Sequence, residues 1–326
     1  MNPLSAVYGR ATRLRRSWYE RHPDARRRLD RPVISVGNLV VGGSGKTPVV
    51  ECIARLLVAN GHRPAILSRG YARRRVREGV VVVTDGDRVL ASLDESGDEP
   101  MMLARKLQGV PVLVSPDRYL SGCLAERRFG CTVHLLDDGF QHLQLARGTD
   151  LLIVDPPDLD ERVLPAGPLR EPADAGRMAD AVLVPGSADD AIRVSSRLGV
   201  ATAFTLARRY GALSALDGSG STPAPGNGTR VLAVAAIARP ERFFSALRTE
   251  GWNVVREIAF PDHHAFTTRD FDSLQRAVVD AGADFVITTG KDAVRVGPRP
   301  RWAALEMDVD IEPLDAFRSW LVGRLS

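Results

Sequence analysis

The sequence predicts an α/β protein with a mostly parallel sheet and helices on both faces. Short runs rich in Val, Ile and Leu, typical of buried strands, alternate with segments of helical periodicity along most of the chain. Strands separated by helices imply crossover connections between parallel neighbours. With 326 residues, 44% of them apolar and 26% charged, the chain is long enough for two folded cores.

The first expected strand, 32–36, is followed by a glycine-rich loop and by a helix from about Lys46 to Asn60. The pattern then predicts a strand at 64–68, a hairpin over 79–91, a helix at 98–108 and strands at 110–115, 132–136, 150–154 and 181–185.

A stretch rich in Gly, Ser and Pro predicts a linker over residues 209–229. It would separate an N-terminal domain, residues 1–208, from a smaller α/β domain, residues 230–326, and leave a cleft between them.

Three cysteines without a CxxC pair make disulfides and a zinc site unexpected, as in a reducing compartment. No apolar stretch is long enough to predict a membrane-spanning helix.

The N-terminal segment is basic, with nine arginines and three acidic side chains in residues 1–32. At helical spacing one stripe comprises Leu4, Val7, Tyr8, Ala11, Leu14 and Trp18. Two interpretations stay open: residues 1–18 lie on an anionic membrane surface, or they pack on the protein's own core and leave a solvated arginine face. Nucleic-acid binding is not expected, because the basic excess ends at Arg31.

The glycine loop ends in Gly45-Lys46-Thr47, as a phosphate-binding P-loop does, but Val40 stands where the first glycine of that motif is expected. In a P-loop, Lys46 would reach the β- and γ-phosphates of a nucleotide and Thr47 would hold Mg²⁺. Backbone N–H groups would come from the loop residues Gly42, Gly43, Ser44 and Gly45. The alternative is a purely structural glycine-rich turn.

Mg²⁺ in such a site also requires a carboxylate at a neighbouring strand end. Asp137 and Asp138, in "LLDDGFQH", are favoured over Asp155, in "LLIVDP", because adjacent carboxylates are costly without a cation.

Three further stretches carry candidate side chains. Asp98, in "GDEP", lies at the expected start of a helix, where the spacing alone favours a capping role. "PDHH" places His263 and His264 beside Asp262 in a loop, where surface positions are the alternative. "LPAGPLREP" presents Arg170, for which a surface ion pair with the next residue is the alternative.

Taken together, these stretches resemble the tetraacyldisaccharide 4′-kinase family of lipid A biosynthesis. The strings that carry the resemblance, in chain order, are "VGNLVVGGSGKTP", "LSRGY", "GDEP", "PDR", "LLDDGFQH", "PAGPLREP" and "FPDHHAF", with "TTGKDAV" following them. The resemblance implies transfer of the γ-phosphate of ATP, with Mg²⁺, to the 4′-hydroxyl of an acylated glucosamine disaccharide 1-phosphate. It also implies a P-loop NTPase-type fold and a peripheral location on the cytoplasmic face of the bacterial inner membrane.

Carried onto this chain, the resemblance implies that Lys46 acts in the P-loop and that Asp98, instead of capping a helix, is the catalytic base with His263 as its partner. Arg118 and Arg170 become candidate phosphate or substrate contacts, and the membrane interpretation of residues 1–18 gains weight.

Two other functions remain possible from the residues alone. A regulatory or motor P-loop NTPase would hydrolyse ATP without an acceptor, and a nucleotide-binding scaffold would lack catalysis. A guanine-specific motif is discounted, because Lys291 directly precedes Asp292 without the intervening residue that the motif requires.

Overall fold

The computed structural model describes residues 3–42, 45–71, 73–219, 222–223, 226 and 228–325. Its strands are β1 (Val33–Asn38), β2 (Pro64–Ser68), β3 (Val81–Thr84), β4 (Val112–Val114), β5 (Val133–Asp137), β6 (Thr149–Ile153), β7 (Ala181–Pro185), β8 (Ala203–Ala215), β9 (Arg230–Ala235), β10 (Asn253–Ala259), β11 (Phe285–Thr289) and β12 (Trp302–Glu312).

The helices are α1 (Pro3–Arg21), α2 (Lys46–Ala59), α3 (Leu93–Ser96), α4 (Asp98–Lys106), α5 (Arg118–Phe129), α6 (Ala188–Leu198), α7 (Pro240–Thr249), α8 (Thr268–Ala281), α9 (Gly290–Val296) and α10 (Leu314–Gly323). Three 3₁₀ turns complete the described elements: η1 (Pro23–Ala25), η2 (Pro156–Asp160) and η3 (Ala173–Met178). None of these described helices combines the length and the apolar character needed to cross a bilayer.

All described strands belong to one sheet, in the order β10-β9-β11-β12-β8-β7-β6-β1-β5-β2-β4-β3. Neighbours are parallel except for the antiparallel pairs β8–β12 and β3–β4. The mostly parallel α/β fold class predicted from the sequence is therefore confirmed.

Side chains that alternate along β6 show how both faces of the sheet are buried. Leu151 and Ile153 pack on the face covered by α2, α4 and α10. Leu152, between them, packs on the opposite face with α6. Such strands need apolar residues at every position, which explains the unbroken apolar runs in the sequence.

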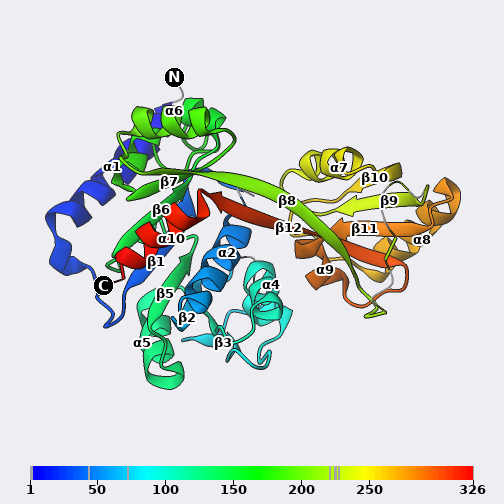
Figure 1. Cartoon of the computed structure of the whole chain (residues 1–326), viewed down its shortest axis with the longest axis horizontal. Coiled ribbons are helices and arrows are strands. Elements are labelled where there is room, and N and C mark those ends of the chain that lie inside the picture. Colours follow the sequence, from blue (N-terminus) through cyan, green and yellow to red (C-terminus); the bar gives the residue numbers. More distant parts are fainter. Residues whose placement is uncertain are drawn as a thin grey trace.

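The long strands β8 and β12 connect two parts of the molecule, as Figure 1 shows. The N-terminal part carries β1–β7 and the C-terminal part carries β9–β11 with α7, α8 and α9. Each part has its own apolar clusters, while Phe317 of α10 returns to the core of the N-terminal part.

The predicted linker is wrong over residues 209–215, which continue β8. Tyr210 pairs with Met307 of β12, and Leu213 pairs with Leu305. Pairing with β12 satisfies the backbone of this stretch, and both side chains pack against the core of the C-terminal part. The Gly and Ser content of residues 209–215 is typical of a linker, and the sequence gives no sign of pairing with a distant strand.

The hairpin expected over residues 79–91 forms only in part. β3 pairs with β4, and the residues after β3 return beside it through one isolated bridge between Thr84 and Val89.

Helix α1 packs through small and polar side chains, contrary to one of the two interpretations of its stripe. The buried residues are Ser5, Gly9 and Arg16. Leu4 and Leu14 of the predicted apolar stripe are 65% and 67% exposed. The interpretation in which this stripe packs on the protein's own core is therefore wrong.

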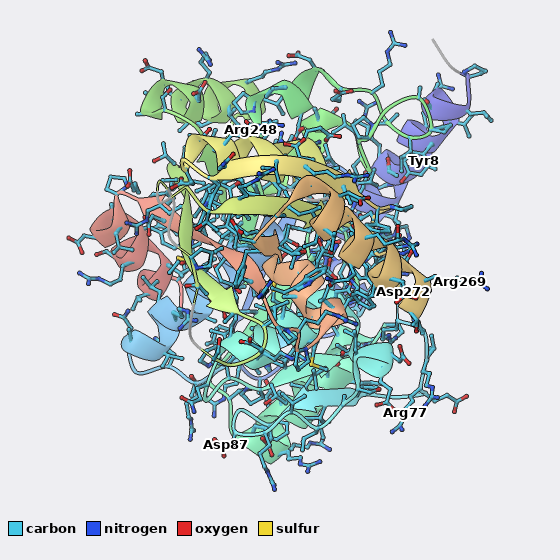
Figure 2. All side chains as sticks on the ribbon, turned by 90° about the vertical axis from the view of Figure 1, so that its right-hand side faces the viewer. Tyr8, Arg77, Asp87, Arg248, Arg269 and Asp272 are labelled. Carbon is cyan, nitrogen blue, oxygen red and sulfur yellow. The ribbon has the colours of Figure 1, made fainter. Side chains whose placement is uncertain are left out.

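The buried contacts of α1 are specific. Arg16 donates from Nε to Glu171 Oε2 at 2.8 Å, and its guanidinium lies 4.5 Å from the centre of the Phe140 ring. Ser5 Oγ accepts a hydrogen bond from the Ala166 amide at 3.1 Å. Elsewhere charged side chains project outward from the rim of the molecule, as Arg77, Asp87 and Arg269 do in Figure 2.

Candidate active site

The glycine loop joins the end of β1 to the start of α2, the position that a P-loop occupies. Gly42 and Gly45 have φ angles of 95° and 81°, in the left-handed region that glycine adopts without steric cost. Gly45 is the residue that precedes α2, so the free amides of its first turn face the loop. Gly43 and Ser44, also predicted to bind phosphate, lie outside the described residues.

The side chain of Lys46 reaches back across the loop to the ends of the central strands. Its Nζ donates to Asn38 Oδ1 at 3.1 Å and lies 3.6 Å from Asp138 Oδ1. Thr47, the next residue, is only 9% exposed.

The two predicted metal-side carboxylates lie at the end of β5, next to β1: Asp137 is the last residue of the strand and Asp138 follows it. Burial, with the negative charges of Asp138 and Glu99, raises the pKa of Asp137 to about 7. Ser68 Oγ donates to Asp137 Oδ2 at 3.3 Å, and no described residue forms an ion pair with this carboxylate. A cation beside Asp137 would relieve this unfavourable charge.

Asp138 lies in a different environment, although it is the next residue. Nη1 of Arg170 lies 2.8 and 2.7 Å from its two carboxylate oxygens. Burial by itself would raise the pKa of Asp138, but the positive charges of Lys46 and Arg170 outweigh burial and hold it below its usual value. Arg170 is therefore paired with Asp138 and not with Glu171.

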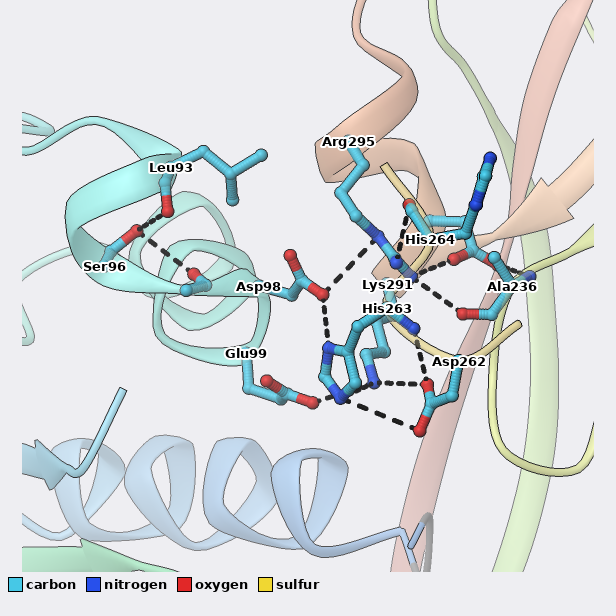
Figure 3. A network of polar contacts seen from close by, with 12 residues as sticks. Leu93, Ser96, Asp98, Glu99, Ala236, Asp262, His263, His264, Lys291 and Arg295 are labelled. Atoms are coloured by element: carbon cyan, nitrogen blue, oxygen red, sulfur yellow. Dashed lines mark hydrogen bonds and ion pairs between the residues drawn. The ribbon is translucent and has the colours of Figure 1, made fainter. Parts of the chain in front are cut away.

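Asp98 and His263 meet where α4 faces the loop after β10 (Figure 3). His263 Nδ1 lies 2.8 Å from Asp98 Oδ2, although 165 positions separate the two residues in the sequence. Asp98 is the first residue of α4, where Gly97 is the capping position and no side-chain cap forms. The capping interpretation of Asp98 is therefore wrong.

The carboxylate of Asp98 is held in its ionised form. Burial would raise its pKa, but the hydrogen bond from His263 and the charges of Arg295 and Lys291 outweigh burial and lower the pKa below its usual value. Arg295 Nε lies 3.5 Å from Asp98 Oδ2. His263 has a φ of 58°, and its amide donates to Asp262 Oδ1 at 3.0 Å, which fixes the backbone that carries the ring.

A family model for tetraacyldisaccharide-1-P 4′-kinase matches residues 1–326. The chain belongs to this family.

Relatives and a solved structure agree with this membership. The chain is 42% identical to the tetraacyldisaccharide 4′-kinase of Geobacter sulfurreducens, over 96% of this chain and 90% of that protein. It is also 42% identical to the same enzyme of Geobacter metallireducens, over 90% and 87%. The crystal structure of LpxK from Aquifex aeolicus in complex with ATP superposes with a TM-score of 0.80 and 31% identity, covering 99% of this chain and 98% of that one.

The chain is thus an ATP-dependent kinase that phosphorylates the 4′-hydroxyl of a tetraacyldisaccharide 1-phosphate in lipid A biosynthesis. The prediction made from the seven strings is confirmed, and the motor NTPase and scaffold alternatives are not.

The structure also shows the surroundings of two other predicted residues, Arg118 and Asp155. Arg118 is 5% exposed, and burial together with the charge of Arg69 lowers its pKa to about 10. Its Nε has no hydrogen-bond partner among the described residues, which leaves a buried cation close to Asp138. Asp155, the alternative metal-side carboxylate, instead lies 3.4 Å from Arg242 and 3.8 Å from Arg208.

His264 contributes to the structure of the kinase beside the site. Its Nε2 lies 3.0 Å from Asp270 Oδ2, and its ring stacks on Phe260 at 4.7 Å. Asp270 belongs to the capping box that begins α8. These contacts direct His264 away from Asp98.

Sequence reasoning missed the contribution of α9. Arg295 and Lys291 project from this helix toward Asp98, and Asp292 holds the loop after β9 by accepting from the Ala236 amide at 2.8 Å. The available signal was the "TTGKDAV" string, which belongs to the family resemblance but carries no assigned role for Lys291 in the sequence-based prediction.

We expect Asp137→Asn to change how the stability of the kinase depends on pH. In the unfolded chain this carboxyl loses its proton near its ordinary pKa of 3.8, whereas the folded protein keeps it until about pH 7. The folded state therefore binds more protons between these values, and the contribution of Asp137 to stability falls as pH rises. The melting temperature of Asp137→Asn, compared with that of the unmodified protein at the same pH, should therefore increase as the pH is raised from 5 to 8.

The measurement is thermal unfolding in chelator without nucleotide. Asp98→Asn is the matched control, because the pKa of Asp98 is lowered and its contribution is already complete above pH 5. Its deficit in melting temperature should stay constant over the same range. A gain for Asp137→Asn that does not change with pH would contradict the assignment.

Proposed function

We propose that this kinase uses Asp98 as a general base, oriented by His263, to activate the 4′-hydroxyl of the lipid acceptor. The observation that carries the proposal is the 2.8 Å contact between His263 Nδ1 and Asp98 Oδ2. The contact leaves Asp98 Oδ1 without a hydrogen bond from any described residue, so this oxygen can accept the proton of the hydroxyl.

In the proposed step, the 4′-oxygen attacks the γ-phosphorus and forms a new O–P bond. The bond between the γ-phosphorus and the bridging oxygen of ADP breaks, and its electron pair stays on ADP. The hydroxyl proton passes to Asp98. Lys46 and Arg170 both form ion pairs with Asp138, where they can hold phosphate oxygens.

The residues at the ends of β1 and β5 fit Mg²⁺. The donor set of hydroxyl and carboxylate oxygens is the one that Mg²⁺ prefers, and the pKa of Asp137 stays raised although the charge of Lys46 lowers it. Thr47, Asp137 and Asp138 would hold the ion. Bound Mg²⁺ neutralises charge on the β- and γ-phosphates.

We further infer that the enzyme lies on the cytoplasmic face of the inner membrane and contacts it through α1. The outward side of this helix combines the stripe residues Leu4, Val7 and Leu14 with exposed arginines such as Arg10. Apolar side chains flanked by arginine favour the boundary of an anionic bilayer. Because the acceptor is a lipid, such a contact would bring the enzyme close to its substrate.

The test of the base is a double-mutant cycle in a phosphate-transfer assay. Asp98→Ala should lower kcat by about 10²–10⁴-fold, as expected for a general base, and leave the KM for ATP nearly unchanged. His263→Ala should lower kcat in the same direction. The double variant should be little worse than the poorer single variant, because residues that act as one unit are non-additive.

His264→Ala is the matched control, since this neighbouring imidazole is paired with Asp270. It should cost much less activity than His263→Ala. Fully multiplicative losses at Asp98 and His263 would refute the pair, and so would a larger loss at His264.

For the metal, Asp137→Asn and Asp138→Asn should each raise the Mg²⁺ concentration needed for half-maximal rate, because an amide is a poorer ligand for a hard cation. Asp155→Asn is the control, because its partners are Arg208 and Arg242. A larger shift for Asp155→Asn than for the other two would show that the wrong strand end was chosen.

For α1, the triple variant Leu4→Ser/Val7→Ser/Leu14→Ser should weaken sedimentation with anionic vesicles and lower efficiency on long-chain acceptor more than on a short-chain analogue. Salt should weaken the attachment of the unmodified protein. Ile192→Ser/Val279→Ser removes side chains that are 62% and 70% exposed on other helices and serves as the control. Equal losses for both variants would contradict a specific role of α1.

A further inference from the structure

Lys291, at the start of α9, occupies the side of His263 that faces away from Asp98 (Figure 3). Its Nζ lies 3.0 Å from Glu99 Oε1, 3.2 Å from Asp262 Oδ1 and 3.2 Å from His263 Nε2. The ammonium therefore joins α4, the loop after β10 and the imidazole ring.

The charge state of Lys291 decides the direction of these hydrogen bonds. Burial would lower its pKa, but the negative charges of Glu99 and Asp262 outweigh burial and raise the pKa above its usual value. The side chain is thus an ammonium near neutral pH, with three N–H donors and no acceptor. Three contacts use these three donors, two on carboxylate oxygens and one on the ring nitrogen.

The ring nitrogen that receives the third donor must offer a lone pair. His263 Nε2 is then unprotonated, and the ring proton lies on Nδ1. Because Nδ1 is 2.8 Å from Asp98 Oδ2, this proton is donated to Asp98. The opposite tautomer would set the N–H of Nε2 against the ammonium and the lone pair of Nδ1 against the carboxylate.

We propose that Lys291 is a positioning residue that fixes His263 as the neutral Nδ1–H tautomer and thereby holds Asp98 as an oriented, ionised acceptor. The proposal rests on the proposed role of Asp98 as the base. It also restricts the proton path, because Nε2 is occupied and the hydroxyl proton can reach only the carboxylate.

Loss of the ammonium should open a second protonation state of the ring. The charged or titratable groups around His263 are Asp98 and Glu99 on α4, Asp262 in its own loop, Lys291 and Arg295 on α9, and Tyr71, whose ring centre is 5.4 Å away. Without Lys291 this set is dominated by carboxylates, which favour the imidazolium. An imidazolium has no lone pair and places a second N–H in the site.

The test uses full-length protein labelled with ¹⁵N-histidine, whose ring-nitrogen shifts report the tautomer directly. In the unmodified protein we expect His263 Nδ1 to be protonated and Nε2 unprotonated at pH 7–8. Lys291→Met should abolish this pattern and give mixed tautomers or imidazolium. It should lower kcat by about 10–100-fold, less than the about 10²–10⁴-fold loss of the base itself. Lys291→Arg keeps a cationic donor and should restore part of the tautomer pattern and part of the turnover.

Lys106→Met is the matched control, because Lys106 is another mostly buried lysine held between two carboxylates, Glu306 at 2.6 Å and Glu51 at 3.3 Å. It should leave the His263 pattern unchanged. Lys291→Gln keeps an N–H donor without the charge and replaces Lys291→Met should that variant fail to fold.

Retention of the Nδ1–H pattern in folded Lys291→Met would overturn the proposal. A raised KM for ATP with an unchanged tautomer would also overturn it, by assigning Lys291 to phosphate binding. If Asp98 is not the base, Asp98→Ala keeps its turnover whatever the ring-nitrogen shifts show. Failure of the proposed function can therefore be told apart from failure of the proposed role of Lys291.

Discussion

The hydrogen bond between Asp98 and His263 is the contact on which the proposed catalytic arrangement depends. The two parts of the molecule share one sheet, in which the described strands β8 and β12 run from one part to the other. The site therefore requires α4 to lie against α9 and the loop after β10. The ion pair between Lys291 and Glu99 joins α4 to α9, and the ion pair between Lys106 and Glu306 joins the other end of α4 to β12. Their charges are mostly buried, so a displaced partner would leave an uncompensated charge, which is costly.

The phosphate side of the site carries a different electrostatic problem. Asp137 is buried and Asp138, the next residue, is partly exposed; the pKa of Asp137 is raised and that of Asp138 is lowered. Lys46 and Arg170 form ion pairs with Asp138, whereas Asp137 has a hydrogen bond from Ser68 and only the more distant charge of Lys46, and these do not outweigh burial. The protein thus keeps one carboxylate at the strand end in an unfavourable state, as expected where stability is given up for ligand binding.

Local features of the site were predictable from the sequence, and non-local ones were not. The start of α2 at Lys46 and the strand end at Asp137 follow from spacing, because a P-loop and a buried strand are defined by neighbouring residues. The pairing of residues 209–215 with β12 could not be read from a stretch rich in Gly and Ser, because its partner lies about a hundred residues away. Asp98 had the spacing of a helix cap, and only the resemblance to a family indicated its contact with His263.

Helix α1 shows how the sequence alone can give the right helix but leave its orientation open. An apolar stripe ordinarily marks the buried face, yet here the buried face consists of Ser5, Gly9 and Arg16. Small residues allow close approach, and Arg16 is buried because Glu171 and the Phe140 ring receive its guanidinium.

The residues that hold α1 are close in the chain to the residues around Asp138. Glu171, which holds α1, directly follows Arg170, which holds Asp138. Phe140, on which Arg16 lies, is two residues from Asp138. A shift of α1 along its axis would therefore move both ends of the Arg170–Asp138 pair. The exposed stripe of α1 and the carboxylates at the strand end are thus linked through Arg16 and its two partners, Glu171 and Phe140.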